Sequence, residues 1–193
     1  MSQPLPPNST PAFNLDDETR TRIEAMLPVF DSVIRVMGES EKPLINEYSM
    51  TNANLAWDVL YHLAVNHAHL HPLIEVNDEI TRVPHKVMQE LATACFSDYD
   101  DLVAVPETFE SITINEAYNS FDLQNSDAGA SFCRIISISP AENAGFAVTV
   151  GLFDDENEEM TASYSFVVVE NTYASMISDP LFYYTIDSVV PAN

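Results

Sequence analysis

The sequence predicts an α+β fold in which about three N-terminal helices pack on one face of a C-terminal antiparallel β-meander. Apolar residues recur at helical spacing in the first half of the chain, and from residue 105 onward they alternate with polar residues. Connections between the alternating segments are short, which favours antiparallel neighbours over parallel crossovers. At 193 residues the chain suits a single domain, with a helical part at 14–104 and a sheet part at 105–193.

The first predicted helix follows a proline-rich tail. Residues 1–13 contain four prolines among polar residues, which cannot build a core, so a disordered tail is expected. Asn14 or Asp16 can cap the helix, which continues to Gly38. Pro28 interrupts its apolar pattern and removes one backbone hydrogen bond, which predicts a kink or a break into two short helices.

Two further helices are predicted before the period changes. One spans about 51–71 and must stop at or before Pro72, because a residue that precedes proline is driven away from helical dihedrals. The other spans 83–96, where Pro84 suits a first helical position. The apolar stripe of the first of these helices is Ala56, Val59, Leu60, Leu63, His67 and Leu70.

Alternating residues then predict a run of strands at 109–114, 117–123, 131–139, 146–153, 160–170 and 181–189. The clearest pair is the hairpin formed by 146–153 and 160–170, for which sequential antiparallel pairing with 131–139 is expected. Its buried face is predicted to lie under the helices and to include Phe146, Val148, Val150, Leu152, Met160, Ala162, Tyr164, Phe166 and Val168. The opposite, wetter face holds Thr149, Thr161, Ser163 and Ser165.

Net charge is the strongest compositional feature, because thirty acidic residues face seven Lys and Arg and give a net charge of -23. Six of the basic residues precede residue 87, where twelve acids leave a net charge of -6, and the remainder sets Arg134 against eighteen acids for a net charge of -17. Nucleic acid and anionic membranes repel such a body, so neither is expected as a direct partner. The acidity can serve binding of a basic partner, or only solubility.

The cysteines and the N-terminus predict a cytoplasmic protein. Cys95 and Cys133 lie far apart without a CxxC partner, so free thiols are expected rather than a disulfide framework or a cysteine zinc site. The N-terminal residues lack the basic start and apolar run of a secretion signal, and no apolar stretch is long enough to span a membrane.

The hairpin connector is the predicted contact site for a partner. It places five carboxylates within six residues at the tip of a stiff two-stranded support: Asp154, Asp155, Glu156, Glu158 and Glu159. Trp57, the single tryptophan, is added as a candidate hot spot, because a half-exposed tryptophan makes a good anchor. The alternative for the connector is an ordinary solvated turn, and for Trp57 a core position.

A histidine-rich segment, 58–75, holds four of the five histidines and suggests metal binding as an alternative. His67 and His71 are four residues apart and could share a zinc ion if both lie on one helix, with Glu75 or His85 as the third ligand. The competing interpretation is a His67 that is hydrogen-bonded within the core. No HExxH, GxSxG, P-loop or dinucleotide-binding motif accompanies the segment, so no cofactor is expected under the main hypothesis.

The leading functional hypothesis is a non-enzymatic acidic protein that binds a basic partner, such as a nucleic-acid-binding enzyme. It would act as a DNA mimic, an inhibitor or an immunity-like antagonist, of the kind that phages encode. One alternative is a small metal-dependent enzyme built on the histidine segment, with zinc as its cofactor. The other is a viral or structural assembly protein in which charge prevents aggregation; the oligomeric state is left open.

Overall fold

The computed structural model describes residues 15–39, 48–127, 129–174 and 180–192, so the predicted tail at 1–13 lies outside the described residues. The helices are α1 (Asp17–Glu24), α2 (Leu27–Glu39), α3 (Ala53–Asn66) and α4 (His85–Cys95). The strands are β1 (Glu75–Val76), β2 (Ile80–Pro84), β3 (Ile112–Asn115), β4 (Ser120–Gln124), β5 (Ser131–Pro140), β6 (Phe146–Asp154), β7 (Met160–Glu170) and β8 (Tyr184–Pro191). The predicted α+β class is confirmed.

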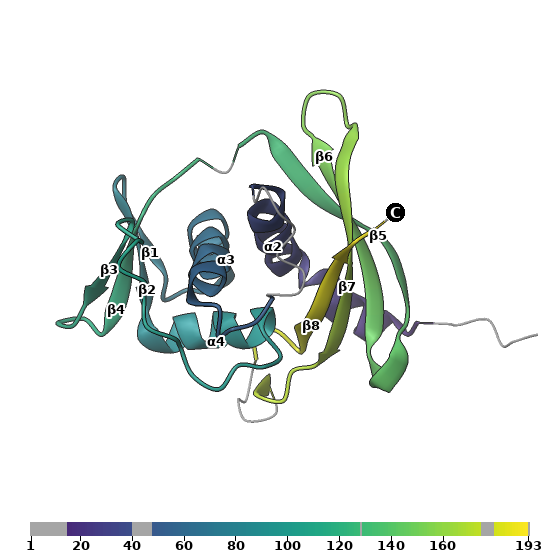
Figure 1. Cartoon of the computed structure of the whole chain (residues 1–193), viewed down its shortest axis with the longest axis horizontal. Helices are drawn as coiled ribbons and strands as arrows, with labels where there is room; N and C mark the ends of the chain where they lie inside the picture. The colour runs from purple at the N-terminus through teal and green to yellow at the C-terminus, as the bar shows by residue number, and fades with distance from the viewer. Residues whose placement is uncertain (1–14, 40–47, 128, 175–179, 193) are drawn as a thin grey trace, which may run out of the picture.

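The described strands form two four-stranded antiparallel sheets, sheet A with order β1-β2-β4-β3 and sheet B with order β5-β6-β7-β8. Figure 1 shows α2 and α3 lying between them, with α3 toward sheet A and α2 toward sheet B. Contacts agree with this view, since α3 touches β2 and β4 while α2 touches β5 and β6. Sheet B is the predicted C-terminal meander with helices on one face, and sheet A, which the sequence did not predict as a separate sheet, lies on the other side of the helical layer.

The break predicted around Pro28 is present. Asp16 caps α1 by accepting a hydrogen bond from the Thr19 backbone N–H at 2.8 Å, and the helix ends at Glu24. Pro28 is the second residue of α2, where its missing N–H costs no intrahelical bond. The chain thus forms two helices because the proline favours a new helix start over continuation of α1.

Sheet A contains the main departure from the predicted helical part. β1 and β2 lie inside the segment 14–104, and β2 pairs with β4 through partners such as Val83 with Phe121. Pro84 ends β2 and precedes α4, so the expected helix at 83–96 starts at His85 instead. Val83 is fully buried on this sheet, and tertiary pairing therefore overrides the local helical pattern.

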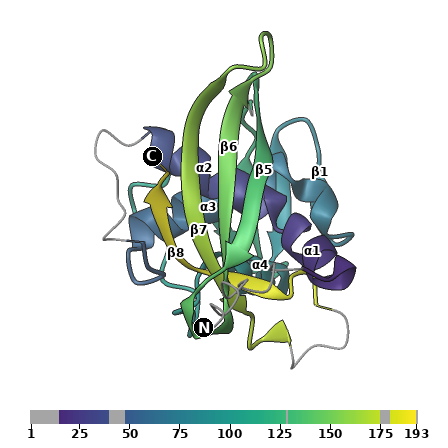
Figure 2. The same ribbon diagram turned by 90° about the vertical axis from the view of Figure 1, so that its right-hand side faces the viewer.

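Sheet B matches the predicted order, with β5 antiparallel to β6 and β6 antiparallel to β7. Val148 pairs with Phe166, and Val150 pairs with Tyr164, so these side chains share the face that meets α2. Ile136 has no partner in the register with β6, which marks a β-bulge in the edge strand. The opposite face of β5, β6 and β7 is turned away from the described helices (Figure 2).

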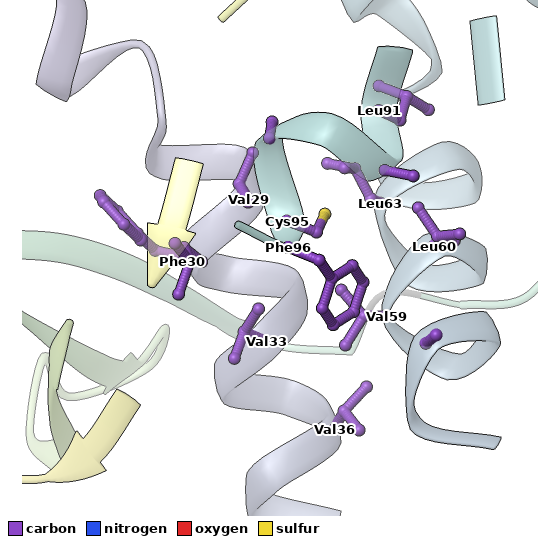
Figure 3. Packing of buried hydrophobic residues seen from close by; sticks show 14 of the residues in the cluster. Val29, Phe30, Val33, Val36, Val59, Leu60, Leu63, Leu91, Cys95 and Phe96 are labelled. Carbon is purple, nitrogen blue, oxygen red and sulfur yellow. The ribbon is translucent and has the colours of Figure 1, made fainter. Parts of the chain in front are cut away.

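The core is one continuous hydrophobic cluster that includes residues from helices and both sheets. Figure 3 shows Val29, Val33 and Val36 of α2 facing Val59, Leu60 and Leu63 of α3, with Phe96 beyond the end of α4 between them. Phe30 of α2 and Phe166 of β7 pack ring against ring, with centroids 4.7 Å apart. This aromatic pair connects the helical layer to sheet B. None of the helices in the described part of the chain combines the length and apolar composition of a membrane span.

Candidate functional site

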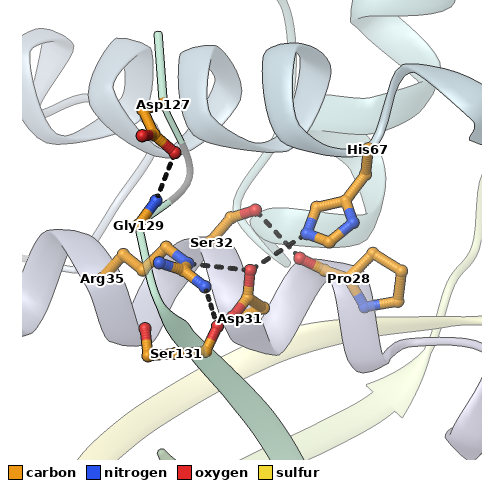
Figure 4. Close-up of polar contacts among 8 residues, drawn as sticks. All are labelled: Pro28, Asp31, Ser32, Arg35, His67, Asp127, Gly129 and Ser131. Carbon is orange, nitrogen blue, oxygen red and sulfur yellow. Dashed lines mark hydrogen bonds and ion pairs between the residues drawn. The ribbon is translucent and has the colours of Figure 1, made fainter. Parts of the chain in front are cut away.

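A cluster of charged side chains joins α2 to the end of α3 and the start of β5 (Figure 4). Asp31 and Arg35 are one turn apart on α2, and Arg35 Nε donates to Asp31 Oδ2 at 2.9 Å. His67 Nε2 lies 3.0 Å from the same oxygen. Arg35 Nη2 donates to the backbone carbonyl of Ser131 at 2.9 Å, which fixes the first residue of β5 against α2.

Asp31 remains ionised at neutral pH although only 6% of the residue is exposed. Burial acts to raise its pKa, but hydrogen bonds from His67 and Arg35 and the positive charge of Arg35 outweigh burial and lower the pKa to about 2. An ionised carboxylate can only accept hydrogen bonds, so His67 Nε2 carries the hydrogen in this contact. A hydrogen-bonded His67 was the alternative to a metal-binding His67, and the contact with Asp31 agrees with that alternative.

Cys133 of β5 borders the same cluster. Burial raises the pKa of its thiol, and the neighbouring carboxylate of Asp31 raises it further. The thiol is therefore protonated at neutral pH, and its chemistry is that of a weak donor rather than a thiolate nucleophile. Asp31, with its low pKa, is likewise a poor general base.

These residues line a pocket of about 330 Å³. Its walls are Leu27, Pro28, Asp31, Arg35, Asn66, His67, Ser131, Phe132 and Cys133. Two side-chain oxygens there, Asp31 Oδ1 and Asn66 Oδ1, are buried without a hydrogen-bond partner among the residues that the structure describes. The sequence carried a signal for part of this site, because Asp31 and Arg35 have the i,i+4 spacing of a helical ion pair.

The metal-site hypothesis required His67 and His71 on one helix, and the structure does not place them so. Helix α3 ends at Asn66, His67 is its C-cap, and His71 follows a short 3-10 turn at Ala68–Leu70. His67 is engaged with Asp31, and His71 Nδ1 accepts a hydrogen bond from the backbone N–H of Leu73 at 3.1 Å. The helix stops early because the segment leading to Pro72 departs from helical dihedrals.

The proposed third ligands lie in other surroundings. Glu75 is exposed in β1, with its carboxylate 4.0 Å from Arg82 Nη1. His85 opens α4, and its ring stacks on Phe121 with centroids 5.5 Å apart. Within residues 15–39, 48–127, 129–174 and 180–192, no group of three His, Cys, Asp or Glu side chains is arranged to hold a metal ion.

Trp57 occupies a core position, with 1% of its surface exposed. Its indole Nε1 donates to the Val103 carbonyl at 3.0 Å, and its ring packs against Phe121 with centroids 5.0 Å apart. A tryptophan whose apolar surface and N–H are both satisfied inside the protein is not available as a surface anchor. Its role in this structure is to join α3 to sheet A.

The acidic connector forms the turn between β6 and β7, and it extends past the rest of the chain as a tip (Figures 1 and 2). Asp154 Oδ1 accepts from the backbone N–H groups of Glu156 and Asn157 at 2.9 and 3.2 Å, which orders the turn internally. Asp155, Glu156, Glu158 and Glu159 are exposed. The tip therefore presents four exposed carboxylates on a hydrogen-bonded support.

An apolar cluster lies beside this tip on the open face of sheet B. We call it the outer-face cluster, and it comprises Phe132, Arg134, Ile136, Phe153 and Met160. The phenyl rings of Phe132 and Phe153 stack with their centroids 5.6 Å apart, and the Arg134 guanidinium carbon lies 4.9 Å from the centroid of the Phe153 ring. Ile136 and Met160 are 50% and 49% exposed.

Gly151 explains how these side chains come together on a strand surface. A Cβ at this position would lie 2.8 Å from Phe153 and 3.0 Å from both Ile136 and Met160, so three side chains converge over a residue that has none. Arg134 joins the cluster to the tip through Glu158, with Nη2 and Oε2 3.7 Å apart. An exposed apolar centre with a charged border resembles the anatomy of protein interfaces.

Comparison of the chain with protein-family models, with curated proteins and with solved structures found no match. Function is therefore inferred from the residues and their geometry.

Proposed function

We propose that the chain is a non-enzymatic interaction protein that binds a basic partner protein through the β6–β7 tip and the outer-face cluster. The observation that carries this proposal is the adjacency of an exposed apolar centre, gathered over Gly151, to four exposed carboxylates on an ordered turn. The partner would offer an apolar contact bordered by Lys or Arg. An inhibitor, an immunity-like antagonist or a DNA mimic that acts on a cytoplasmic nucleic-acid-binding enzyme fits this chemistry.

The two parts of the surface would have different energetic roles. Carboxylates at an exposed tip attract a cationic surface over long range and speed association, while surface ion pairs themselves add little stability in water. Burial of Ile136, Met160 and the phenyl edges would supply affinity, because apolar area removed from water contributes roughly 25 cal/mol per Å² before the entropic cost of association. An ordered tip lowers that cost relative to a flexible acidic tail.

Neutralising the tip should slow association with the partner without unfolding the protein. The tip variant combines Asp155→Asn, Glu156→Gln, Glu158→Gln and Glu159→Gln, and it keeps Asp154 because that carboxylate orders the turn. Loss of the tip charge should lower the association rate about tenfold at low salt and flatten its salt dependence. Surface plasmon resonance at several salt concentrations, with the partner purified by affinity capture on the wild-type chain, measures this change.

A matched control removes the same number of charges from segments that flank the strands of sheet A. It combines Glu79→Gln, Glu107→Gln, Glu110→Gln and Glu116→Gln, all at exposed positions. Because only net charge changes there, its association rate should fall by about twofold or less. Equal rates and salt slopes for the two variants would show that the tip is an ordinary turn and would contradict the proposal.

A further inference from the structure

We propose that the basic partner contributes an extended segment that adds to sheet B as a further strand along β5, with one apolar side chain in the pocket between α2, the end of α3 and the start of β5. This inference rests on the proposed function and deepens it, because it names the part of the partner that is bound. Proteins commonly bind a peptide by adding it to a sheet edge, where backbone hydrogen bonds give affinity and side-chain pockets give specificity.

β5 is the longest edge strand in the described part of the chain. It spans ten residues, whereas the edge strands of sheet A, β1 and β3, span two and four. The other edge strand of sheet B, β8, is partly engaged, because the Ile186 carbonyl accepts a hydrogen bond from the backbone N–H of Ser97 at 3.0 Å. Among the described residues, the one side chain that donates to the β5 backbone is Arg35, through Nη2 to the Ser131 carbonyl.

The Arg35 contact shows which backbone groups of β5 point away from β6. In an antiparallel strand the N–H and C=O of one residue point to the same side, and successive residues alternate. Since the Ser131 carbonyl points to Arg35 of α2 rather than to β6, the N–H and C=O groups of Cys133 and Ile135 point to the same outer edge. These two residues therefore offer four backbone groups to an added strand, before the bulge at Ile136 changes the alternation.

The pocket beside this edge can take one side chain of an added strand. It measures about 330 Å³, and β5 is the one strand of sheet B that lines it, so it lies at the edge of the sheet rather than beneath its centre. A residue directly opposite Cys133 directs its side chain to the same face as Cys133, which lines the pocket. Leu27, Pro28 and Phe132 supply apolar surface there, which favours a Leu, Ile or Val side chain. The residues on either side of it would face the outer-face cluster.

Charge complementarity favours a basic segment as the occupant of this edge. The β6–β7 tip lies next to the start of β5, because Ser131 pairs with Asp154 and the Ala130 carbonyl accepts from the Asp155 backbone N–H at 3.2 Å. An added strand would run two strand spacings, or about 10 Å, from β6, so Lys or Arg side chains at its end can reach the carboxylates of the tip. A second copy of this chain carries a net charge of -23 and would be repelled.

The probe is the acetylated and amidated heptapeptide TVTLTKK, which has a leucine for the pocket and two lysines for the tip. Amide hydrogen exchange of the isotope-labelled chain, measured by NMR, gives the direct readout. In the chain alone Cys133 and Ile135 should exchange faster than Phe132 and Arg134, whose N–H groups point to β6. With about 1 mM peptide and a dissociation constant of about 0.25 mM, exchange of Cys133 and Ile135 should slow about fivefold.

Two results of this measurement would overturn the proposal. One is unchanged exchange of Cys133 and Ile135 at about 1 mM peptide. The other is a chain that sediments as a dimer without peptide and in which both amides are already protected, because a second copy would then occupy the edge.

Two N-methylated peptides separate an added strand from simple charge attraction. Methylation of the leucine nitrogen removes the N–H that would donate to the Cys133 carbonyl, whereas methylation of the threonine that follows removes an N–H that points away from β5. The two peptides have the same charge and composition. The first should bind about tenfold more weakly than the second, and equal binding of the two would contradict backbone pairing along β5.

Leu27→Trp tests the pocket by filling it from α2. The variant should bind TVTLTKK about tenfold more weakly, because the leucine of the peptide loses its site. Leu73→Trp, which lies outside this pocket with 60% of the leucine exposed, is the matched control and should bind as the wild type does. Wild-type affinity in Leu27→Trp would contradict the assignment of the leucine to the pocket.

The tip variant keeps the two proposals distinguishable. It should bind TVTLTKK more weakly at low salt, yet saturating peptide should still slow exchange at Cys133 and Ile135. Unchanged affinity in the tip variant, with that slowing retained, would count against the proposed function alone. Weakened affinity in the tip variant, with no slowing in the wild type, would count against the added strand alone.

Discussion

Phe30→Ala should lower the free energy of unfolding by about 4 kcal/mol, which is among the largest effects that a single truncation produces. Phe30 has no exposed surface, and its ring packs on Phe166 between α2 and sheet B. Truncation removes buried area and leaves a cavity at the junction of two layers, where neither the helix nor the sheet can move without breaking other contacts. Urea unfolding followed by circular dichroism measures the change.

Ile114→Ala is the matched control for this prediction. Ile114 lies on sheet A with 59% of its surface exposed, so its truncation should change the free energy of unfolding by about 0.5 kcal/mol or less. A Phe30→Ala protein that unfolds at the same urea concentration as Ile114→Ala would show that α2 does not pack on sheet B as described.

Asp31→Asn should destabilise the protein by about 3 kcal/mol at pH 7, because it leaves the largely buried Arg35 cation without its carboxylate partner. The destabilisation caused by Asp31→Asn should become smaller at acidic pH. The pKa of Asp31 is lowered to about 2 from its ordinary value of 3.8. Its ionisation therefore contributes stability that is present above pH 4 and is lost as the pH falls through 2, in total about 2 kcal/mol.

The measurement is the free energy of unfolding of wild type and Asp31→Asn from pH 7 to pH 2. The difference between them should narrow between pH 4 and pH 2, because the wild-type carboxyl is protonated there. Asp78→Asn, at an exposed position, should follow the wild type throughout. A difference that stays constant over this range would mean that Asp31 is not held ionised by its neighbours.

The features that depend only on neighbouring residues in the chain were predictable from the sequence. The alternation in 146–153 and 160–170 placed Val148 and Phe166 on the buried face, and both are fully buried. The same prediction was wrong for Met160, which is 49% exposed, because the register between β6 and β7 shifts between Leu152 and Phe153. A strand with one buried face leaves this mark in any sequence, because its side chains alternate between two environments. The break near Pro28 was predictable for a similar reason, since it follows from the covalent structure of proline.

Pairing between strands that are far apart in the chain left no comparable pattern in the sequence. β2 is five residues long and continues directly into α4, so its apolar residues also fit a helical stripe, and only its pairing with β4 shows that it is a strand. The cluster of Asp31, Arg35 and His67 also depends on a contact between distant parts of the chain. Asp31 and Arg35 have helical ion-pair spacing, but the contact with His67 spans 36 residues and depends on how α3 ends. The sequence allowed Trp57 to be either a surface anchor or a core residue, and its packing against Phe121 shows that it is a core residue.

The proposed binding surface also combines a predictable part with an unpredictable one. The carboxylates of the tip are evident in the sequence as five acids within six residues. The outer-face cluster depends on the register between strands, which sets Gly151 opposite Arg134 and brings Ile136 and Met160 over it. A β-bulge at Ile136 contributes to this arrangement, and bulges follow from the pairing of two strands rather than from one strand alone.

The central claim is that a cationic partner contacts the tip and the outer-face cluster, and methyl NMR with a short oligolysine peptide tests it most directly. Labelled methyl groups of Met160 and Ile136 report on this surface, while the exposed methyl groups of Ile114 report on sheet A. We predict that the peptide shifts the Met160 signal first and the Ile136 signal next, with Ile114 unchanged, and that the tip variant loses these shifts. Shifts of Ile114 equal to those of Met160, or shifts that persist in the tip variant, would contradict the claim.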